Sequence, residues 1–323
     1  MKDKILVTGG AGYIGSKVSH DLINQGHKVF IVDNLSTGFK KLIPKKAKFF
    51  FCDILNKKKI IKIILENNIN VVMHFAASLS VEESEKDSKK YYKNNVLGTE
   101  KILEAITFCN VKYFIFSSTC AVYGNVKKKV DENQIPKPKS IYAKTKLDCE
   151  LLIKKFSLKY NLYYSILRYF NVAGADLRNN VGCLNNNGQL FKNICLSIKN
   201  KNYKIEIYGK NYNTIDGTCI RDYIHLNDIS KIHYLSLKNL KKKNKSFIIN
   251  CGYGRGYSVY EIVNSFEKYI KRKFKKIFKK RRSGDIAEIT SDVSKMKRIL
   301  KFKFKKNPIK KIISSAIYWE LHN

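Results

Sequence analysis

The sequence is poor in proline and in acidic residues and has no long apolar run, and each shortage excludes a class of protein. Four prolines in 323 residues, with 44% hydrophobic and 12% aromatic residues, exclude a mainly disordered chain. No run of 18 or more apolar residues occurs, and a strand pattern begins within four residues of the start, which leaves no room for a signal peptide. We therefore expect a folded cytoplasmic protein with no membrane partner, with about two domains at roughly 150 residues each.

The eight cysteines also lack the patterns of metal and redox sites. They form no CxxC pair and no cluster with histidine at the spacing of zinc ligands. We expect reduced, buried thiols and no metal.

The shortage of acidic residues leaves a net charge of +37, from 63 Lys and Arg against 26 Asp and Glu. Such a large positive charge is typical of proteins that bind nucleic acids or acidic membranes, but it also results from a general compositional drift of the proteome towards Lys, Asn and Ile. The lysines are scattered over the whole chain, and even the densest run, 271–282, carries apolar residues between its nine basic ones. We favour the compositional explanation and expect no specific nucleic-acid partner.

Short apolar runs alternate with longer helical patterns, which is typical of a parallel sheet covered by helices on both faces. The expected strands are 5–7, 29–32, 48–51, 71–75, 113–116, 165–169 and 247–250, and the expected helices are 14–25, 57–67, 91–108 and 142–160. The predicted fold is α/β, a doubly wound Rossmann-type sheet with a smaller C-terminal α/β domain. We expect residues 1–170 to form a nucleotide domain and 171–323 mainly a substrate domain, with segments near 215–255 returning to the first.

A glycine-rich turn joins the first expected strand to the first helix. Gly9 permits a tight turn, Gly12 lets a pyrophosphate approach the backbone, and Gly15 lets the helix pack closely on the strand. The same glycines could form a turn without a ligand, but the strand before and the helix after them favour a dinucleotide site.

Two acidic residues follow the next strands. Asp33 ends the second strand, 18 residues beyond Gly15, near the offset of about 20 for the acid that binds the adenosine ribose. Its charge would repel a 2′-phosphate, so NAD is preferred over NADP. Asp33 could also cap the following turn, and Asp53 could be a turn residue or could reach the adenine.

Three residues could carry acid–base chemistry. Tyr142 and Lys146 are four residues apart on an expected helix, hence on one face, where an ammonium would favour a phenolate. Thr119 ends the strand run 113–116 with Ser117 and Ser118, at the edge of the sheet where ligands bind. Each feature alone is typical of a surface pair or a cap, and their combination favours catalysis.

Together these motifs resemble the extended short-chain dehydrogenase/reductases. Longer strings resemble, more narrowly, the family of UDP-glucose 4-epimerases. They are residues 8–16 (TGGAGYIGS), 74–77 (HFAA), 91–96 (YYKNNV), 167–171 (LRYFN), 216–225 (DGTCIRDYIH) and 281–285 (RRSGD).

The resemblance implies tightly held NAD and a UDP-sugar substrate. The implied NAD contacts are Tyr13, Ile14, Asp33, Asn34, Asp53, Ile54, Phe75, Ala76, Asn94, Lys146 and Phe170. The implied UDP-sugar contacts are Asn171, Leu190, Tyr208, Arg221, Arg282 and Asp285, with Gln189 where the family often has Asn or His. The guanidinium groups of Arg221 and Arg282 suit a diphosphate, although either could instead form an ion pair with a neighbouring Asp.

Other positions depart from the family pattern. Glu82 stands where Gly is usual, which puts the geometry near the nicotinamide in question, and Ile141 replaces a common Pro. Ile289 occupies the position that gates sugar size, where a large Tyr tends to exclude N-acetylhexosamines. Its intermediate bulk leaves the acceptance of N-acetylated sugars open.

The resemblance implies an isomerase that interconverts UDP-galactose and UDP-glucose. The sugar C4 would be oxidised by bound NAD, the 4-keto ring would turn about the diphosphate, and reduction would follow on its other face. Tyr142 would move the proton, Lys146 would hold the ribose, and Thr119 would bind the 4-oxygen.

Other functions stay open. A UDP-N-acetylglucosamine or dual-specificity epimerase is the nearest alternative, and a non-catalytic nucleotide or nucleic-acid binder is a more distant one. A sugar-nucleotide dehydratase is disfavoured because Cys120 and Ala121, rather than an acidic pair, follow Thr119. Relatives commonly dimerise through helices equivalent to 91–108 and 142–160, so we expect a homodimer.

Overall fold

The computed structural model describes residues 2–126, 129–176, 178, 180–185, 188–282, 285–304 and 308–323. The chain divides into two compact units. Unit 1 comprises residues 1–122, 138–168 and 230–249, and unit 2 comprises residues 123–137, 169–229 and 250–323.

The framework of unit 1 is a seven-stranded sheet, as the sequence predicts. Its strands are β1 (Lys4–Thr8), β2 (Lys28–Asp33), β3 (Lys48–Phe51), β4 (Val71–His74), β5 (Tyr113–Thr119), β6 (Tyr163–Tyr169) and β10 (Phe247–Cys251). The order is β10-β6-β5-β4-β1-β2-β3, and β1 pairs in parallel with both β2 and β4. The strand order therefore reverses at β1, and the carboxyl ends of β1 and β4 form the switch point where such sheets bind ligands.

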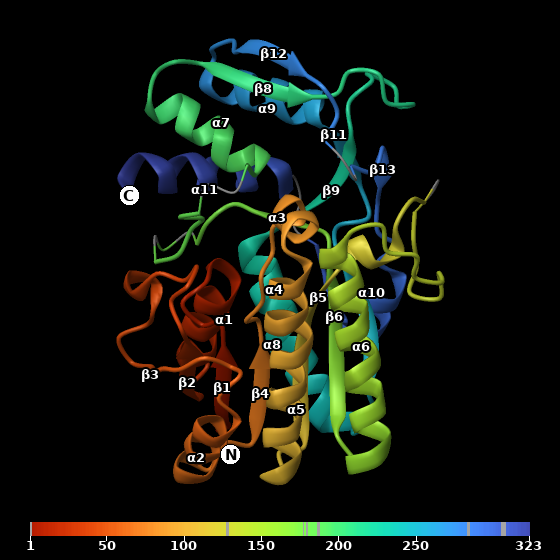
Figure 1. Ribbon diagram of the computed structural model, residues 1–323. Helices are drawn as coiled ribbons and strands as arrows, with labels where there is room; N and C mark the ends of the chain where they lie inside the picture. The colour runs from red at the N-terminus through yellow and green to blue at the C-terminus, as the bar shows by residue number, and fades with distance from the viewer. Residues whose placement is uncertain are drawn as a thin grey trace. The chain divides into compact units, whose positions relative to one another are not determined.

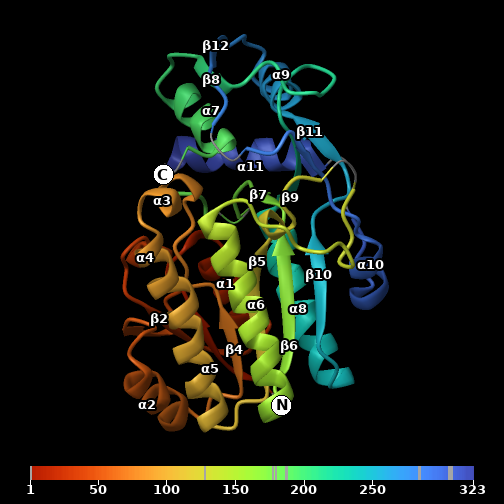
Figure 2. The same cartoon turned by 45° about the vertical axis from the view of Figure 1, so that its right-hand side comes forward.

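Helices cover both faces of this sheet (Figures 1 and 2). They are α1 (Tyr13–Asn24), α2 (Lys57–Asn67), α3 (Val81–Lys86), α4 (Ser88–Tyr91), α5 (Gly98–Phe108), α6 (Ile141–Tyr160) and α8 (Leu226–Lys243). Helices α2, α5 and α6 share one face, while α1 and α8 lie on the other, where Ser230 donates to Asp21 at 2.6 Å. The doubly wound fold is confirmed.

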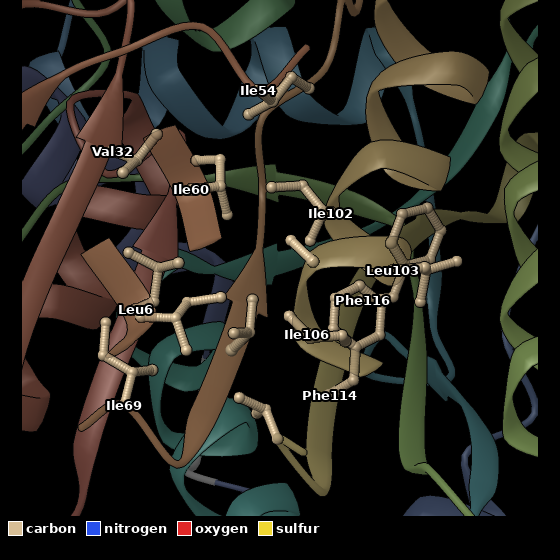
Figure 3. Packing of buried hydrophobic residues seen from close by; sticks show 14 of the residues in the cluster. Leu6, Val32, Ile54, Ile60, Ile69, Ile102, Leu103, Ile106, Phe114 and Phe116 are labelled. Atoms are coloured by element: carbon tan, nitrogen blue, oxygen red, sulfur yellow. The ribbon is translucent and has the colours of Figure 1, made fainter. Parts of the chain in front are cut away.

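One apolar cluster holds α2, α5 and α6 on the sheet (Figure 3). Ile60 of α2, Ile102 and Ile106 of α5, and Phe114 and Phe116 of β5 are all 0–1% exposed. Complete burial of branched and aromatic side chains contributes roughly 1.5–3 kcal/mol each, so this cluster stabilises the packing of the helices on the sheet. Cys149 and Ile153 of α6, both 0% exposed, belong to it.

The expected single helix 91–108 is interrupted. A π-helical segment, η2 (Tyr92–Leu97), separates α4 from α5. Its buried Asn95 accepts from the Ser78 N–H at 2.8 Å and donates to the Thr145 hydroxyl at 3.2 Å. These side-chain bonds accompany the local π geometry, which often marks functional sites.

Unit 2 contains two small sheets. Strand β9 (Ile220–His225) pairs with β7 (Asn171–Ala173), β11 (Gly256–Ser258) and β13 (Glu288–Ile289), and β8 (Lys204–Tyr208) pairs in parallel with β12 (Lys275–Lys279). The helices are α7 (Leu190–Lys199), α9 (Val259–Ile270), α10 (Ser294–Leu300) and α11 (Pro308–His322). A second apolar cluster, including Phe191, Phe266 and Ile312, packs α7, α9 and α11 together.

Each unit is built from more than one chain segment. Residues 230–249 belong to unit 1 because α8 and β10 complete its helix layer and sheet. Residues 123–137 belong to unit 2, where Val130 bridges to Ser291 and the Tyr123 hydroxyl donates to Asn250 at 2.7 Å.

The helices, the cysteines and the possible metal ligands can be compared with what the composition predicts. No helix in the described part of the chain combines the length and apolarity needed to cross a membrane. All eight cysteines are outside disulfides, and six of them are buried. Within the described ranges no group of three or more His, Cys, Asp or Glu side chains could hold a metal ion.

Candidate active site

The glycine-rich turn fits a dinucleotide. Gly9 has φ +70°, and a Cβ there would lie 2.6 Å from the Ala76 nitrogen. A Cβ on Gly15 would lie 2.3 Å from the Gly9 oxygen, so the helix and the loop approach too closely for any side chain. A Cβ on Gly12 would meet one atom, the Gly9 oxygen at 3.2 Å, and Gly12 is the N-cap of α1 without a side-chain hydrogen bond. The turn therefore leaves backbone room for a diphosphate at the N-terminus of a helix.

The first two residues of α1, Tyr13 and Ile14, are half-buried beside this turn.

Asp33 lies at the end of β2, directly beside the turn. Its carboxylate accepts from the N–H of Ala11 at 3.0 Å and of Leu35 at 2.8 Å, and burial raises its pKa. The next residue, Asn34, donates to the Asp53 carboxylate at 2.9 Å. Through these contacts Asp33 caps the turn that follows β2, which is one of the roles expected from the sequence. The bond from Ala11 also places its carboxylate beside the glycine-rich turn.

The other expected cofactor residues of unit 1 lie at the carboxyl ends of neighbouring strands. Phe75 and Ala76 follow β4 and are half-buried, and Ile54 follows β3, where a Cβ on Gly98 would lie 2.5 Å from its Cδ1. Asn94, on η2, donates to the Ser78 hydroxyl at 3.1 Å. These positions surround the switch point of the sheet.

Thr119, Tyr142 and Lys146 come together at the carboxyl end of β5. The Thr119 hydroxyl and the Tyr142 phenol are neighbours there. One turn further along α6, the Lys146 ammonium donates to the Ser117 carbonyl at 2.8 Å and lies 4.8 Å from the centre of the Phe116 ring. The predicted convergence of a phenol, an amine and a hydroxyl is therefore present in unit 1.

Burial governs the protonation of this group. It raises the pKa of the Tyr142 phenol above its ordinary value of 10, and the nearby Thr119 hydroxyl offsets only part of this. Burial also lowers the pKa of Lys146 to about 8. The sequence predicts that Lys146 favours the phenolate, but in the chain alone desolvation dominates and the phenol is neutral at pH 7.

A buried ion pair behind Lys146 was not predicted. Glu150, 0% exposed, binds Arg168 of β6 through two contacts of 3.0 and 2.6 Å and accepts from the Ser118 hydroxyl at 2.6 Å. It ties α6 to β5 and β6 next to the reacting side chains. Its place four residues after Lys146, on the same helix face, is the signal that could have identified it.

A buried histidine was also missed. His74, at the end of β4, lies 2.6 Å from the Thr8 hydroxyl and 3.1 Å from the Thr99 hydroxyl. Burial and then the nearby Lys146 lower its pKa to about 3, so the ring is neutral at physiological pH. Through these two contacts the His74 ring links β4 to β1, which leads into the glycine turn, and to α5.

In unit 2, several expected substrate residues also lie close to one another. The Arg282 guanidinium stacks on the Tyr208 ring at 3.9 Å and donates to the Gly188 carbonyl at 3.4 Å. Arg221 lies 3.5 Å from the Asp285 carboxylate, so the ion pair considered as its alternative role is present. Each guanidinium carries more N–H donors than these contacts occupy, which suits an anion as a further partner.

Five more expected positions are in unit 2. Phe170 is buried and donates its N–H to Cys251, whereas Asn171 is exposed at the start of β7. Gln189 and Leu190 begin α7, next to the Arg282 contact with Gly188. Ile289 is 2% exposed and pairs with Arg221. Residues 283 and 284 of the RRSGD string lie outside the described residues.

A hollow of about 520 Å³ in unit 2 lies elsewhere, and none of the expected substrate residues lines it. Its walls include Tyr253, Arg255, Tyr257 and Phe304.

The sequence matches the NAD dependent epimerase/dehydratase family over residues 5–252. The chain belongs to this family. Among curated relatives, a UDP-glucose 4-epimerase of Lactobacillus helveticus is 38% identical over 318 residues, which cover 98% of this chain and 96% of the relative.

Solved structures extend the similarity to the whole fold of the family. UDP-glucose 4-epimerase from Brucella ovis, crystallised with NAD, is 34% identical and superposes with a TM-score of 0.93 over 98% of both chains. The UDP-Glc/GlcNAc 4-epimerase of Campylobacter jejuni is 35% identical, with a TM-score of 0.84 over 98% of this chain and 99% of that one.

Proposed function

We propose that this chain is an NAD-dependent isomerase that interconverts UDP-galactose and UDP-glucose at C4 of the sugar. The observation that carries the proposal is the neighbouring pair of Thr119 and Tyr142, with Lys146 one turn further along α6, at the edge of the sheet. A phenol, a hydroxyl and an ammonium in this order suit proton transfer at an alcohol that is oxidised and reduced again.

The glycine turn, the acids and the strand ends of unit 1 fit NAD. Gly9, Gly12 and Gly15 would admit the diphosphate, Asp33 would bind the adenosine ribose, and Lys146 would bind the nicotinamide ribose. The other proposed contacts are Tyr13, Ile14, Asn34, Asp53, Ile54, Phe75, Ala76, Asn94 and Phe170. When bound, NAD accepts a hydride from the sugar carbon and returns it.

Tyr142 takes and returns the proton of the sugar 4-hydroxyl, and Thr119 binds the same oxygen. Because burial keeps the phenol neutral in the chain alone, positive charge in the loaded site has to favour the phenolate. Both faces of the sugar must reach the same phenol, so the substrate is held by its diphosphate and not by its ring. Arg221 and Arg282 would bind that diphosphate, with Asn171, Gln189, Leu190, Tyr208 and Asp285 around it.

N-acetylated UDP-sugars are a second possible class of substrate. Ile289 is smaller than the Tyr that tends to exclude N-acetylated sugars, and it lies beside Arg221 in unit 2. A similar structure has the name UDP-Glc/GlcNAc 4-epimerase. Acceptance of UDP-N-acetylglucosamine is therefore the alternative specificity.

The active form proposed is a homodimer. Helices α5 and α6 expose large apolar side chains, including Phe108 (69%), Leu151 (53%) and Leu158 (90%), which a second copy would cover. Sedimentation at micromolar concentration should give twice the mass of one chain, and a monomer under these conditions would contradict this.

The activity is tested with purified protein loaded with NAD. Incubation with UDP-galactose, without added reductant, should yield UDP-glucose with no net formation of NADH. Parallel incubation with UDP-N-acetylgalactosamine tests the alternative. If the loaded protein leaves both sugars unchanged, the proposed function is wrong.

A further inference from the structure

Three side chains bind the backbone at the start of α6, and two of them come from another helix. Ser140 accepts from the Ala143 N–H at 3.2 Å, as an ordinary N-cap does. Ser84 of α3 accepts from the Tyr142 N–H at 3.1 Å, and the exposed Glu85 accepts from the Ile141 N–H at 2.8 Å. The backbone that carries the reacting phenol is therefore held by α3.

Helix α3 is itself well anchored. The Ser80 hydroxyl caps it, and the buried Tyr91 phenol donates to the Ser80 carbonyl at 2.6 Å and to the Glu83 carboxylate at 2.9 Å. Glu82, whose effect the sequence leaves open, points to solvent with an 82% exposed side chain and pairs with Lys86 at 2.7 Å. Glu82 and Glu85 thus share a helix, and it is the Glu85 carboxylate that accepts a hydrogen bond from α6.

The bond to Glu85 exists because residue 141 is not proline. Ile141 is the first residue of α6, a position where proline is well tolerated but offers no N–H. The preceding Ser140 has φ −110° and ψ 156°, which is the extended conformation that a following proline requires. Proline could therefore be built at 141 with loss of this donor and little else.

We propose that Glu85 is a positioning residue: with Ser84 it fixes the first turn of α6, and so keeps the Tyr142 phenol aligned with Thr119. This inference rests on the proposed role of Tyr142 in the epimerase reaction. A carboxylate at the N-terminus of α6 is also favourable to the helix, since it meets the positive end of the helix dipole. Displacement of a reacting group by about 1 Å can cost roughly a factor of 10² in rate, so a loosened first turn should be visible in kcat.

The experiment is a double-mutant cycle on the NAD-loaded protein with UDP-galactose. Glu85→Ala should lower kcat about fivefold with KM unchanged, and Glu85→Gln, which keeps an acceptor oxygen, should restore most of it. In the background of Ile141→Pro, where the donor is gone, Glu85→Ala should have no further effect. Lys86→Ala, which changes an exposed side chain of the same helix, is the matched control and should leave kcat within about twofold.

The outcomes separate this inference from the proposed function. If the wild-type protein turns over and Tyr142→Phe abolishes this, the proposed function holds. In that case an unchanged kcat in Glu85→Ala, or additive effects of the substitutions at 85 and 141, overturns only the role of Glu85. A fall in kcat that Lys86→Ala matches, or that follows a lowered melting temperature, also overturns it. Absence of turnover in the wild-type protein overturns both.

Discussion

The reacting residues in unit 1 and the expected substrate residues in unit 2 are held in different ways. In unit 1, Lys146 is 2% exposed and binds a backbone carbonyl, and the neighbouring Glu150 is 0% exposed in a bidentate ion pair. In unit 2, Arg282 is exposed and rests on a tyrosine ring with one carbonyl contact of 3.4 Å.

The difference matches the two tasks of the proposed reaction. Proton transfer needs fixed geometry, and side chains locked by buried hydrogen bonds provide it. Holding a diphosphate while a sugar ring turns needs charge and reach rather than a single geometry, and an exposed guanidinium such as that of Arg282 supplies these. Substitutions in unit 1 should therefore reduce kcat or folding, and those in unit 2 should reduce substrate affinity.

The largest effect is expected from Tyr142→Phe. It removes the proton carrier but keeps the ring, so kcat should fall by a factor of about 10² or more while NAD stays bound. Steady-state kinetics and the absorbance of bound nucleotide measure the two quantities. Tyr160→Phe, near the exposed end of the same helix, is the control, and an equal loss in both variants would argue against a specific role.

Two glycines of the turn should separate folding from cofactor binding. Gly15→Ala places a Cβ 2.3 Å from the Gly9 oxygen and should lower the free energy of unfolding by about 2 kcal/mol. Gly12→Ala brings a Cβ to 3.2 Å from the same oxygen, a milder contact, so it should lower the free energy of unfolding less than Gly15→Ala does but weaken NAD binding about tenfold or more. Urea unfolding and nucleotide titration measure these, and the reverse pattern would refute the assigned geometry.

The buried His74 should make unit 1 sensitive to acid. Its pKa is about 3 in the folded chain, against the ordinary histidine value of 6.5, so the unfolded chain binds more protons between these values. Stability is then full above pH 6.5 and falls as the pH decreases, by about 2 kcal/mol at pH 5 from this residue.

His74→Asn should flatten that slope in urea unfolding at pH 7 and pH 5, whatever its effect on stability at pH 7. His27→Asn is the comparison, because burial lowers the pKa of His27 while Asp3 opposes the shift, and its slope should change less. Equal slopes for the wild type and His74→Asn would contradict the assignment.

The fold could be predicted because its signals are local and repeated. Continuous apolar runs marked the seven strands of the large sheet, and the spacing of Tyr142 and Lys146 placed both on one helix face. The interruption at η2 could not be predicted, since it accompanies bonds from Asn95 to Ser78 and Thr145 that depend on tertiary contacts.

The missed parts of the site share one cause. Ser84 and Glu85 bind the start of α6 across 58 and 56 residues of sequence, and Glu150 of α6 binds Arg168 of β6. The periodicity of apolar residues in the sequence does not indicate such long-range contacts. The neutral state of the Tyr142 phenol in the chain alone could not be predicted either, because desolvation depends on the packed neighbourhood and the spacing to Lys146 indicates only a favourable charge.

The smallest effect, and the sharpest contrast with unit 1, is expected from Arg282→Lys. Lysine keeps the charge but loses the planar stack on Tyr208 and the fork that suits a diphosphate. Because this contact would be equal in the ground and transition states, KM for UDP-galactose should rise about tenfold with kcat nearly unchanged. Arg281→Lys, stacked on Tyr212 at 4.1 Å in the same segment, is the matched control and should change KM less than twofold. A fall in kcat at Arg282 as large as the rise in KM would mean that unit 2 also sets the reacting geometry, and the contrast between the two units would not hold.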